Sequence, residues 1–317
     1  MPEILVISGK GGTGKTTLTA AFAHLAFEAG DRPVICDLDV DAPDLHLLLD
    51  PSRQVTEEFV SGHEAVIDPG KCEDCGLCAD VCRFDAVIKR GTKGQRDKGT
   101  KGTGPGNSGP SAYRIDPMRC EGCKLCVVQC PAGAIDFPDR MCGHWHLSET
   151  RFGPMVHAQL LPGEENSGRL VTLLRQKAGA MAKEEKRSLV LSDGPPGIGC
   201  PVISSLSGID LTVIVTEPTP SGRHDLERIV ELCDHFNVPA GVIINKQDLN
   251  PDEVAAIDRF CESRGLHRLG RIDYDPKMIE AMVRRQTVTE YTDVGIGEQI
   301  RTLWRRIIAW AHMSEAA

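Results

Sequence analysis

The stretch SGKGGTGKTT, Ser8 to Thr17, decides the fold of this 317-residue chain because of what surrounds it. It follows ILVIS (4–8), an unbroken apolar run typical of a buried parallel strand. After it comes LTAAFAHLAFEAG (18–30), which has apolar residues at helical spacing and ends on a glycine suited to a C-cap. A strand, a glycine-rich loop and a helix in this order indicate a P-loop that binds nucleotide phosphates. The alternative is an ordinary glycine turn before a helix.

Each part of this loop has an expected task. The backbone N–H groups and the helix N-terminus would face the phosphates. Lys15 would neutralise charge on the β- and γ-phosphates, and the Thr16 hydroxyl would hold Mg²⁺. The predicted nucleotide-binding residues of the loop are Gly11, Gly12, Thr13, Gly14, Lys15, Thr16 and Thr17.

A P-loop needs one lysine, and this one contains a second, Lys10. The run KGGTGKTT resembles the deviant Walker A motif of the MinD/ParA/Mrp-type ATPases (SIMIBI class), which include the nitrogenase iron protein. The resemblance implies that Lys10 reaches the nucleotide bound by a facing subunit, as an arginine finger does. Active sites would then form only in a dimer, either a homodimer or a heterodimer with a paralogue. The alternative is that Lys10 is a solvated loop charge.

Two further stretches fit the same family. In RPVICDLDVDAPDL (32–45) the resemblance implies that Asp39 orients the attacking water close to Mg²⁺. In SLVLSDGPPGIG (188–199) it implies that Asp193 holds Mg²⁺ through water and that Gly197 senses the γ-phosphate. The expected catalytic residues are Lys10, Lys15, Asp39 and Asp193, and the expected Mg²⁺ site is Thr16, Asp39 and Asp193. The alternative for the acids near Asp39 is that they cap the start of a helix.

The base-binding residue is expected in GVIINKQD (241–248). Asn245 resembles the base-binding asparagine of the ATPase family. The run NKQD also matches the guanine-reading pattern of GTPases. ATP is favoured over GTP because the surrounding motifs are of the ATPase type.

Eight of the thirteen cysteines lie in two copies of one unit between residues 67 and 135. IDPGKCEDCGLCADVCRFDAV starts at Ile67 and IDPMRCEGCKLCVVQCPAGAI at Ile115; after a shift of 48 residues, ten of 21 positions are identical. Each copy is C-x₂-C-x₂-C-x₃-C, the bacterial two-cluster ferredoxin signature, in which the fourth cysteine of each run serves the other cluster. Paired zinc sites are the alternative, but zinc ligands usually come as two C-x₂-C pairs.

This signature predicts two 4Fe–4S clusters with exchanged ligands. The first would be held by Cys72, Cys75, Cys78 and Cys130, and the second by Cys120, Cys123, Cys126 and Cys82. The copies differ after the fourth cysteine, where Arg83 replaces the proline of the second copy, and this arginine is expected to alter the potential of its cluster or to mark a docking surface. The glycine-rich segment 89–111 has six basic residues and one acidic residue, which predicts a flexible loop or a docking arm for an acidic redox partner.

The remaining cysteines give weaker signals. Cys200 lies just after the Asp193 segment, where members of the nitrogenase iron protein family bind a cluster shared across the dimer. That cluster needs two cysteines per subunit and no second candidate is found, so we favour a buried structural cysteine. The alternation of Cys142, His144 and His146 indicates one face of a strand rather than a metal site.

Charge and hydropathy exclude several classes. A net charge of −9 argues against general nucleic-acid binding. There is no basic, apolar leader at the start and no run of eighteen apolar residues, so we expect a cytoplasmic chain without stable membrane insertion. The amphipathic segment 296–313 is expected to dock on the core, with a MinD-like membrane helix as the alternative.

Together these features predict a doubly wound α/β ATPase domain, with a mostly parallel sheet, interrupted by an α+β ferredoxin domain. The expected segments are 1–62 and 141–317 for the ATPase and 63–140 for the insert. The expected function is an ATP- and Mg²⁺-dependent iron–sulfur ATPase that couples nucleotide state to electron transfer. Its partner would be a redox protein or a metal-cluster client, of the kind found with orange-protein and nitrogenase-cofactor proteins. The alternative is a factor that assembles or carries metal clusters.

Overall fold

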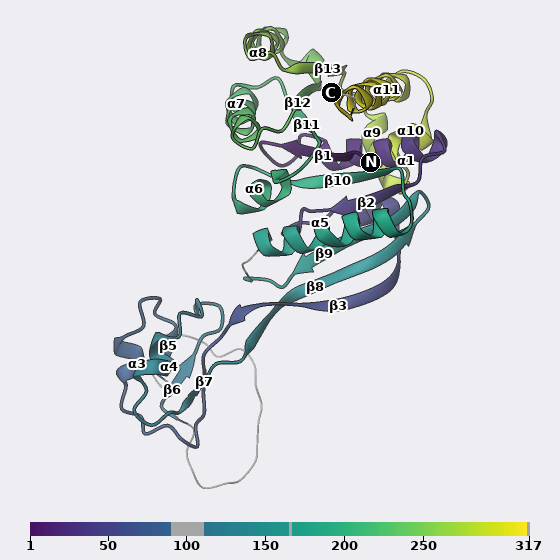
Figure 1. Cartoon of the computed structure of the whole chain (residues 1–317). Coiled ribbons are helices and arrows are strands. Elements are labelled where there is room, and N and C mark those ends of the chain that lie inside the picture. Colours follow the sequence, from purple (N-terminus) through teal and green to yellow (C-terminus); the bar gives the residue numbers. More distant parts are fainter. Residues whose placement is uncertain (90–110, 165–166, 316–317) are drawn as a thin grey trace. The chain divides into compact units, whose positions relative to one another are not determined.

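The computed structural model describes residues 1–89, 111–164 and 167–315 (Figure 1). The chain divides into two compact units. The larger unit consists of Met1–Glu58, Gly143–Leu160 and Glu165–Ala317, and the smaller of Phe59–Cys142 and Leu161–Glu164. Almost all of the predicted basic loop, 90–110, lies outside the described residues.

The larger unit is built on a nine-stranded sheet with the order β13-β12-β11-β1-β10-β2-β9-β8-β3. Neighbouring strands from β13 to β9 are parallel, and β8 runs antiparallel to β9. The predicted α/β fold with a mostly parallel sheet is therefore confirmed. The strands are β1 (Glu3–Ser8), β2 (Pro33–Asp37), β3 (Ser52–His63), β8 (Asp139–Thr150), β9 (Gly153–Leu160), β10 (Leu189–Pro196), β11 (Leu211–Thr216), β12 (Ala240–Asn245) and β13 (His267–Ile272).

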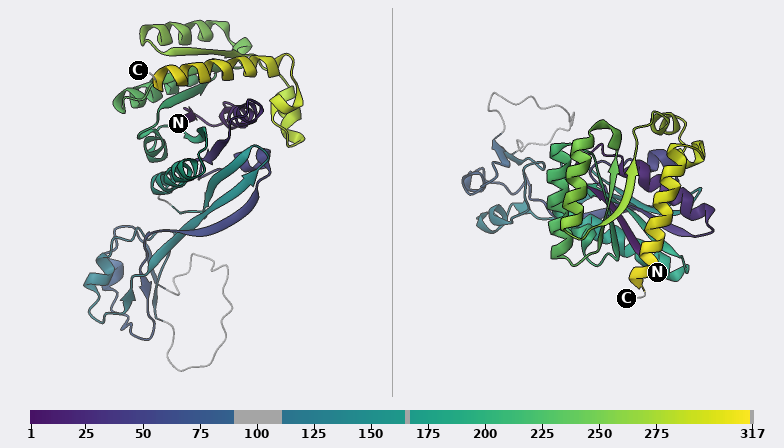
Figure 2. Two further views of the ribbon diagram at one scale, coloured as in Figure 1. Left: turned by 45° about the vertical axis from the view of Figure 1, so that its right-hand side comes forward. Right: turned by 90° about the horizontal axis from the view of Figure 1, so that it is seen from above.

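Helices cover both faces of this sheet, as the view from above shows (Figure 2). Helices α1, α10 and α11 contribute to one core together with Ile4 and Val6 of β1, while α5, α6, α7 and α8 lie on the other face. The helices are α1 (Lys15–Glu28), α2 (Leu45–Leu49), α5 (Ser167–Glu184), α6 (Cys200–Leu206), α7 (Pro220–His235), the 3₁₀ turn η1 (Gln247–Leu249), α8 (Pro251–Ser263), α9 (Lys277–Val283), α10 (Val288–Tyr291) and α11 (Ile296–Glu315).

Helix α11 contains the amphipathic segment of the sequence. Its apolar stripe, Ile296, Ile300, Leu303 and Ile307, is at most 2% exposed and belongs to the core. Helix α11 therefore packs its apolar stripe against the core of the larger unit, as expected. None of the helices in the described ranges combines the length and the apolarity that a membrane span requires.

The smaller unit reproduces the sequence repeat in three dimensions. Its elements are β4 (Val66–Ile67), α3 (Leu77–Asp80), β5 (Val87–Lys89), β6 (Tyr113–Ile115), α4 (Leu125–Gln129) and β7 (Ile135–Asp136). The start of each copy pairs with the end of the other, β4 with β7 and β5 with β6. The hydrogen bond from Asp68 N to Ala134 O, 2.8 Å, has its counterpart 48 residues on, from Asp116 N to Ala86 O, 2.7 Å. The two copies therefore exchange their ends around an approximate two-fold axis.

Candidate functional site

The P-loop connects β1 to α1 and takes its shape from two glycines. Gly12 and Gly14 have φ angles of 80° and 89°, a left-handed conformation that costs glycine little. A Cβ atom on Gly14 would lie 2.6 Å from Asn245 Nδ2, so Gly14 also permits a close contact. No acidic side chain occupies the first turn of α1, and its N-terminal N–H groups favour an anion such as a phosphate.

Lys15 is the first residue of α1 and is 6% exposed. Its Nζ lies 3.0 Å from Asp193 Oδ2 and 3.7 Å from Asp39 Oδ2. Burial alone would lower the pKa of Lys15, but the charges of Asp193, Asp39 and Asp37 outweigh burial and raise it. Lys15 is therefore a fixed positive charge beside three aspartates: Asp37 at the end of β2, Asp39 two residues after it, and Asp193 within β10.

The expected Mg²⁺ ligands lie beside this lysine. Thr16 Oγ1 donates a hydrogen bond to Asp193 Oδ2 at 2.7 Å, and Thr19 Oγ1 donates to the other carboxylate oxygen at 3.0 Å. Oxygen ligands of this kind suit Mg²⁺, which keeps several waters and takes one or two carboxylates. The structure thus brings Thr16 and Asp193 into direct contact.

Asp37, the last residue of β2, and Asp39, two residues after it, have different surroundings. Asp39 faces the cavity described next, and burial, only partly offset by Lys15, raises its pKa to about 6. Asp37 is 1% exposed and accepts hydrogen bonds from the N–H groups of Asp39 and Leu45. Asp37 therefore stabilises the loop and the start of α2, which is the helix-capping role considered as the alternative for these acids. Asp39 remains available to a ligand.

Lys15, Thr16 and Asp39 line a cavity of about 660 Å³ at the carboxyl ends of the strands. Parallel α/β sheets bind ligands at this edge. The P-loop from Gly11 to Thr17 lines one part, and Tyr274, Met278 and Met282 line another. Thr13 also lines the cavity, and its buried hydroxyl has no hydrogen-bond partner in the part of the chain that the structure describes.

Asn245 and Gly197 differ from what the resemblance implies for them. Asn245 lines the cavity, but its Nδ2 donates to Thr13 O at 2.7 Å, so in this state it supports the P-loop. The N–H of Gly197 donates to Ser8 O at 2.9 Å, so it is engaged with β1 rather than free for a γ-phosphate. In a nucleotide-bound state, the hydrogen bond from Gly197 N–H to Ser8 O would have to break for Gly197 to contact the γ-phosphate.

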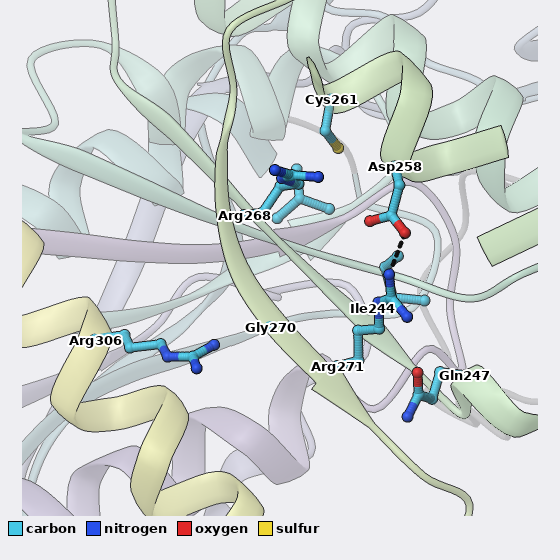
Figure 3. Close-up of a pocket in the computed structure, with 9 residues that line it drawn as sticks. Ile244, Gln247, Asp258, Cys261, Arg268, Gly270, Arg271 and Arg306 are labelled. Atoms are coloured by element: carbon cyan, nitrogen blue, oxygen red, sulfur yellow. Dashed lines mark hydrogen bonds and ion pairs between the residues drawn. The ribbon is translucent and has the colours of Figure 1, made fainter. Parts of the chain in front are cut away.

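A second cavity, of about 370 Å³, lies between β12, β13, α8 and α11 (Figure 3). Arg271 is paired with Asp258 across it. Gln247 lines this cavity, and its Nε2 donates to Asp273 Oδ1 at 2.8 Å. Asp273 lines the nucleotide cavity and also accepts from Gln299 Nε2 at 2.8 Å. The hydrogen bonds from Gln247 and Gln299 lower the pKa of Asp273, so this part of the nucleotide cavity carries a fixed negative charge.

The cysteines of the two copies come together in the smaller unit. Cys72, Cys75, Cys78 and Cys130, three from the first copy and one from the second, line a single cavity. The N–H of Ala134 donates to Cys130 Sγ at 3.3 Å, and that of Ala86 donates to Cys82 Sγ at 3.4 Å. Within residues 1–89, 111–164 and 167–315, no three His, Cys, Asp or Glu side chains converge closely enough to hold one metal ion.

The third cysteine of each copy is affected by burial and by the two cysteines before it. Burial, followed by the neighbouring Cys120 and Cys123, raises the pKa of Cys126 to about 11. Burial, followed by Cys72 and Cys75, also raises the pKa of Cys78, its counterpart in the first copy. Each copy thus gathers its own three cysteines.

Two other expectations have clear outcomes. Cys142 is buried on β8 and donates to Ser61 O at 3.1 Å, and His144 and His146 follow it on the same strand, as expected. Cys200, expected to be buried, is exposed as the first residue of α6, because the inward side chains of that helix are Val202, Ser205 and Leu206. The expectation of a buried Cys200 was therefore wrong.

A family model described as the CobQ/CobB/MinD/ParA nucleotide binding domain matches residues 4–288. The chain belongs to this family.

Individual relatives agree with the CobQ/CobB/MinD/ParA assignment. An uncharacterized protein of Methanocaldococcus jannaschii is 33% identical over 248 residues, 78% of this chain and 79% of the relative. The cell division ATPase MinD of Pyrococcus furiosus has a similar structure, with a TM-score of 0.57 at 16% identity over 98% of this chain and 99% of that one. MinD of Pyrococcus horikoshii, solved with Mg-ADP, gives 0.55 at 17% identity over 99% and 98%. At these identities the two structures establish the fold alone.

Sequence reasoning missed several residues around this family's nucleotide site. Glu217 follows β11 directly and contacts two lysines, Lys10 and Lys246. Tyr274 follows β13 and lines the nucleotide cavity. Both lie within two residues of the end of a strand at the same edge of the sheet, and this position was the signal that could have identified them.

Proposed function

We propose that this chain is a dimeric, Mg²⁺-dependent ATPase that couples its nucleotide state to electron transfer through two 4Fe–4S clusters. The observation that carries the proposal is that Cys72, Cys75, Cys78 and Cys130 line one cavity. A cluster of four irons is held by sulfurs around a cube rather than at one shared point, so its ligands need not converge as those of a single ion do. The cavity therefore fits the ligand set that the sequence predicts.

The symmetry of the smaller unit supports the second cluster. The pairing of β5 with β6 matches the pairing of β4 with β7. Cys82 of the first copy would therefore lie near the cysteines of the second copy, just as Cys130 lies near those of the first. The ligands would be Cys120, Cys123, Cys126 and Cys82. N–H donors to Cys130 and Cys82 would stabilise negative charge on the sulfurs, which is one means by which proteins set cluster potentials. When bound, such clusters supply one-electron chemistry.

In the nucleotide site, each of the following residues would have one role. Lys15 and the P-loop N–H groups bind the phosphates, while Thr16 and Asp193 hold Mg²⁺. Asp39, on the cavity wall, orients the attacking water. Lys10 contributes positive charge to the nucleotide of the partner subunit. The bond from Gly197 to Ser8 must open for Gly197 to contact the γ-phosphate, and this is the switch by which nucleotide state would move the chain.

Electron transfer is preferred to cluster assembly because each cluster would have four protein ligands. A fully ligated cluster is poorly suited to being handed on. Cys75 and Cys123 are exposed, so one ligand of each proposed cluster would be accessible to a redox partner or a metal-cofactor protein.

The test has two parts. After anaerobic reconstitution with iron and sulfide, the chain should contain about eight irons and show the EPR signal of reduced 4Fe–4S clusters. With ATP and Mg²⁺ it should release phosphate at a rate per subunit that rises with protein concentration, because the active site needs a partner subunit. Fewer than four irons per chain would contradict the cluster proposal. A rate independent of concentration, in a chain that stays monomeric, would contradict the dimer.

A further inference from the structure

Lys10, the lysine expected to act on a partner subunit, has a partner within its own. Lys10 Nζ lies 3.3 Å from Glu217 Oε2 and 3.5 Å from Thr219 Oγ1. The Lys10 side chain is 33% exposed and that of Glu217 13%, so the ion pair is partly shielded from water. Lys10 is not among the residues that line the nucleotide cavity of its own chain.

Glu217 is shared between two lysines. Its other oxygen, Oε1, pairs with Lys246, and Lys246 Nζ also reaches Gly12 O at 3.5 Å. If Lys10 departs, Glu217 keeps the ammonium of Lys246 as its counter-charge. The departure of Lys10 therefore does not leave an unpaired, largely buried carboxylate, which would be strongly unfavourable. The arrangement allows Lys10 to leave at low cost.

We propose that Glu217 is a positioning residue that holds Lys10 within its own subunit while the subunit is alone. This inference rests on the proposed dimer, in which Lys10 acts on the nucleotide of the partner. On dimer formation Lys10 exchanges the carboxylate of Glu217 for the phosphates of that nucleotide, and Glu217 remains paired with Lys246. Dimer closure must therefore break the Lys10–Glu217 pair, and Glu217 sets how readily closure occurs.

The contact itself is tested in the nucleotide-free chain. The Lys10 amine is acetylated with an N-hydroxysuccinimide ester, and its labelling rate is followed by peptide mass spectrometry. Glu217→Gln should raise the rate at Lys10 by about two- to fivefold, the range for loss of a partly exposed ion pair. The matched control Glu227→Gln removes the same charge from a residue paired with Arg223 and should leave the rate unchanged. Equal rates in wild type and Glu217→Gln would overturn the proposal.

The consequence for closure is tested by sedimentation with a non-hydrolysable ATP analogue and Mg²⁺. Glu217→Gln should raise the dimer association constant by about two- to fivefold. In a Lys10→Ala background the same substitution should change nothing, because there is no lysine left to hold. Weaker association in Glu217→Gln, or an equal effect without Lys10, would overturn the positioning role. A wild-type chain that never dimerises would contradict the proposed function instead. The labelling rates would still test whether Glu217 holds Lys10.

Discussion

The ammonium of Lys15 lies 3.0 Å from Asp193 Oδ2, and both side chains are buried. Asp39 and Asp37 are two further acidic side chains whose charges act on Lys15. Without nucleotide, Lys15 therefore balances the negative charge of its own site. In the proposed nucleotide-bound state, Lys15 would turn to the phosphates, and Asp193 would then be free to help hold Mg²⁺. The two lysines of the loop differ accordingly: one is buried in its own site, and the other is half-exposed.

Lys15→Ala should abolish ATP hydrolysis and also destabilise the nucleotide-free chain. Loss of one partner leaves buried carboxylates uncompensated, which typically costs about 3 kcal/mol or more. Urea unfolding without nucleotide measures this free energy. Lys10→Ala is the matched control and should lower it by less than about 1 kcal/mol, because Lys10 is partly exposed. Equal stability of the two variants would show that Lys15 is not the counter-charge.

Lys10→Ala should bind ATP normally but hydrolyse it slowly. The missing charge belongs to the partner's site, so a mixture of Lys10→Ala and Lys15→Ala should recover activity. In the mixed dimer, the Lys10→Ala subunit binds ATP and receives the intact Lys10 of the other. Phosphate release is measured before and after mixing. If the mixture stays as inactive as the separate variants although mixed dimers form, Lys10 does not act in trans.

The chain should prefer ATP to GTP. Asp248 is the residue that would read guanine in the NKQD pattern, but it accepts the Tyr274 N–H at 2.6 Å and does not line the nucleotide cavity. The donor groups on guanine would therefore lack an acceptor. Competition of ATP and GTP for a fluorescent ADP measures the preference. Equal affinities would mean that Asp248 turns into the cavity when guanine binds.

The sequence predicted the parts of the molecule whose geometry is local. The P-loop and the cysteine runs are recognisable because consecutive residues make the site, and Gly12 and Gly14 adopt the left-handed angles the loop requires. The strand carrying Cys142 was also predicted, since alternation along a strand needs no knowledge of its partner.

The rest depends on contacts between distant segments. Glu217 meets Lys10 only because β11 lies beside β1 in the sheet, and strand order cannot be read from the strands themselves. Tyr274 engages Asp248 for the same reason, since β13 lies beside β12. The roles of Asn245 and Gly197 were inferred for a nucleotide-bound state, and in this structure their hydrogen bonds go to the chain itself.

A histidine cluster in the larger unit should make the fold sensitive to acid. Burial lowers the pKa of His157 to about 3 and that of His146 to about 4, with further lowering by Arg53 and by the other histidines nearby. A lowered pKa means that the unfolded chain takes up protons first, so stability falls as the pH drops below about 6.5. Each histidine contributes up to about 1.4 kcal/mol per pH unit.

This acid sensitivity is measured by urea unfolding at pH 7 and pH 5. His157→Gln, which can keep a hydrogen bond to Ser148 Oγ, should show a smaller difference between the two pH values than the wild type. An unchanged difference would assign the sensitivity to other groups.

Cys78→Ala should lose one cluster and keep the other. The iron content of the reconstituted chain should fall from about eight to about four, because the second ligand set is complete without Cys78. ATP binding should be retained, since the P-loop belongs to the other unit. Cys200→Ala, which removes an exposed cysteine outside both sets, should leave the iron content unchanged. Loss of iron in the second variant alone would require a different set of ligands.

The central claim is that nucleotide state and clusters are coupled, and an anaerobic redox titration followed by EPR tests it most directly. The reconstituted wild-type chain is titrated with ADP and Mg²⁺, and then with a non-hydrolysable ATP analogue and Mg²⁺. Coupling predicts that the midpoint potential or the spectrum of at least one cluster changes between the two nucleotides, and that Lys15→Ala abolishes the change. Identical titrations, in a chain shown to bind both nucleotides, would contradict the account.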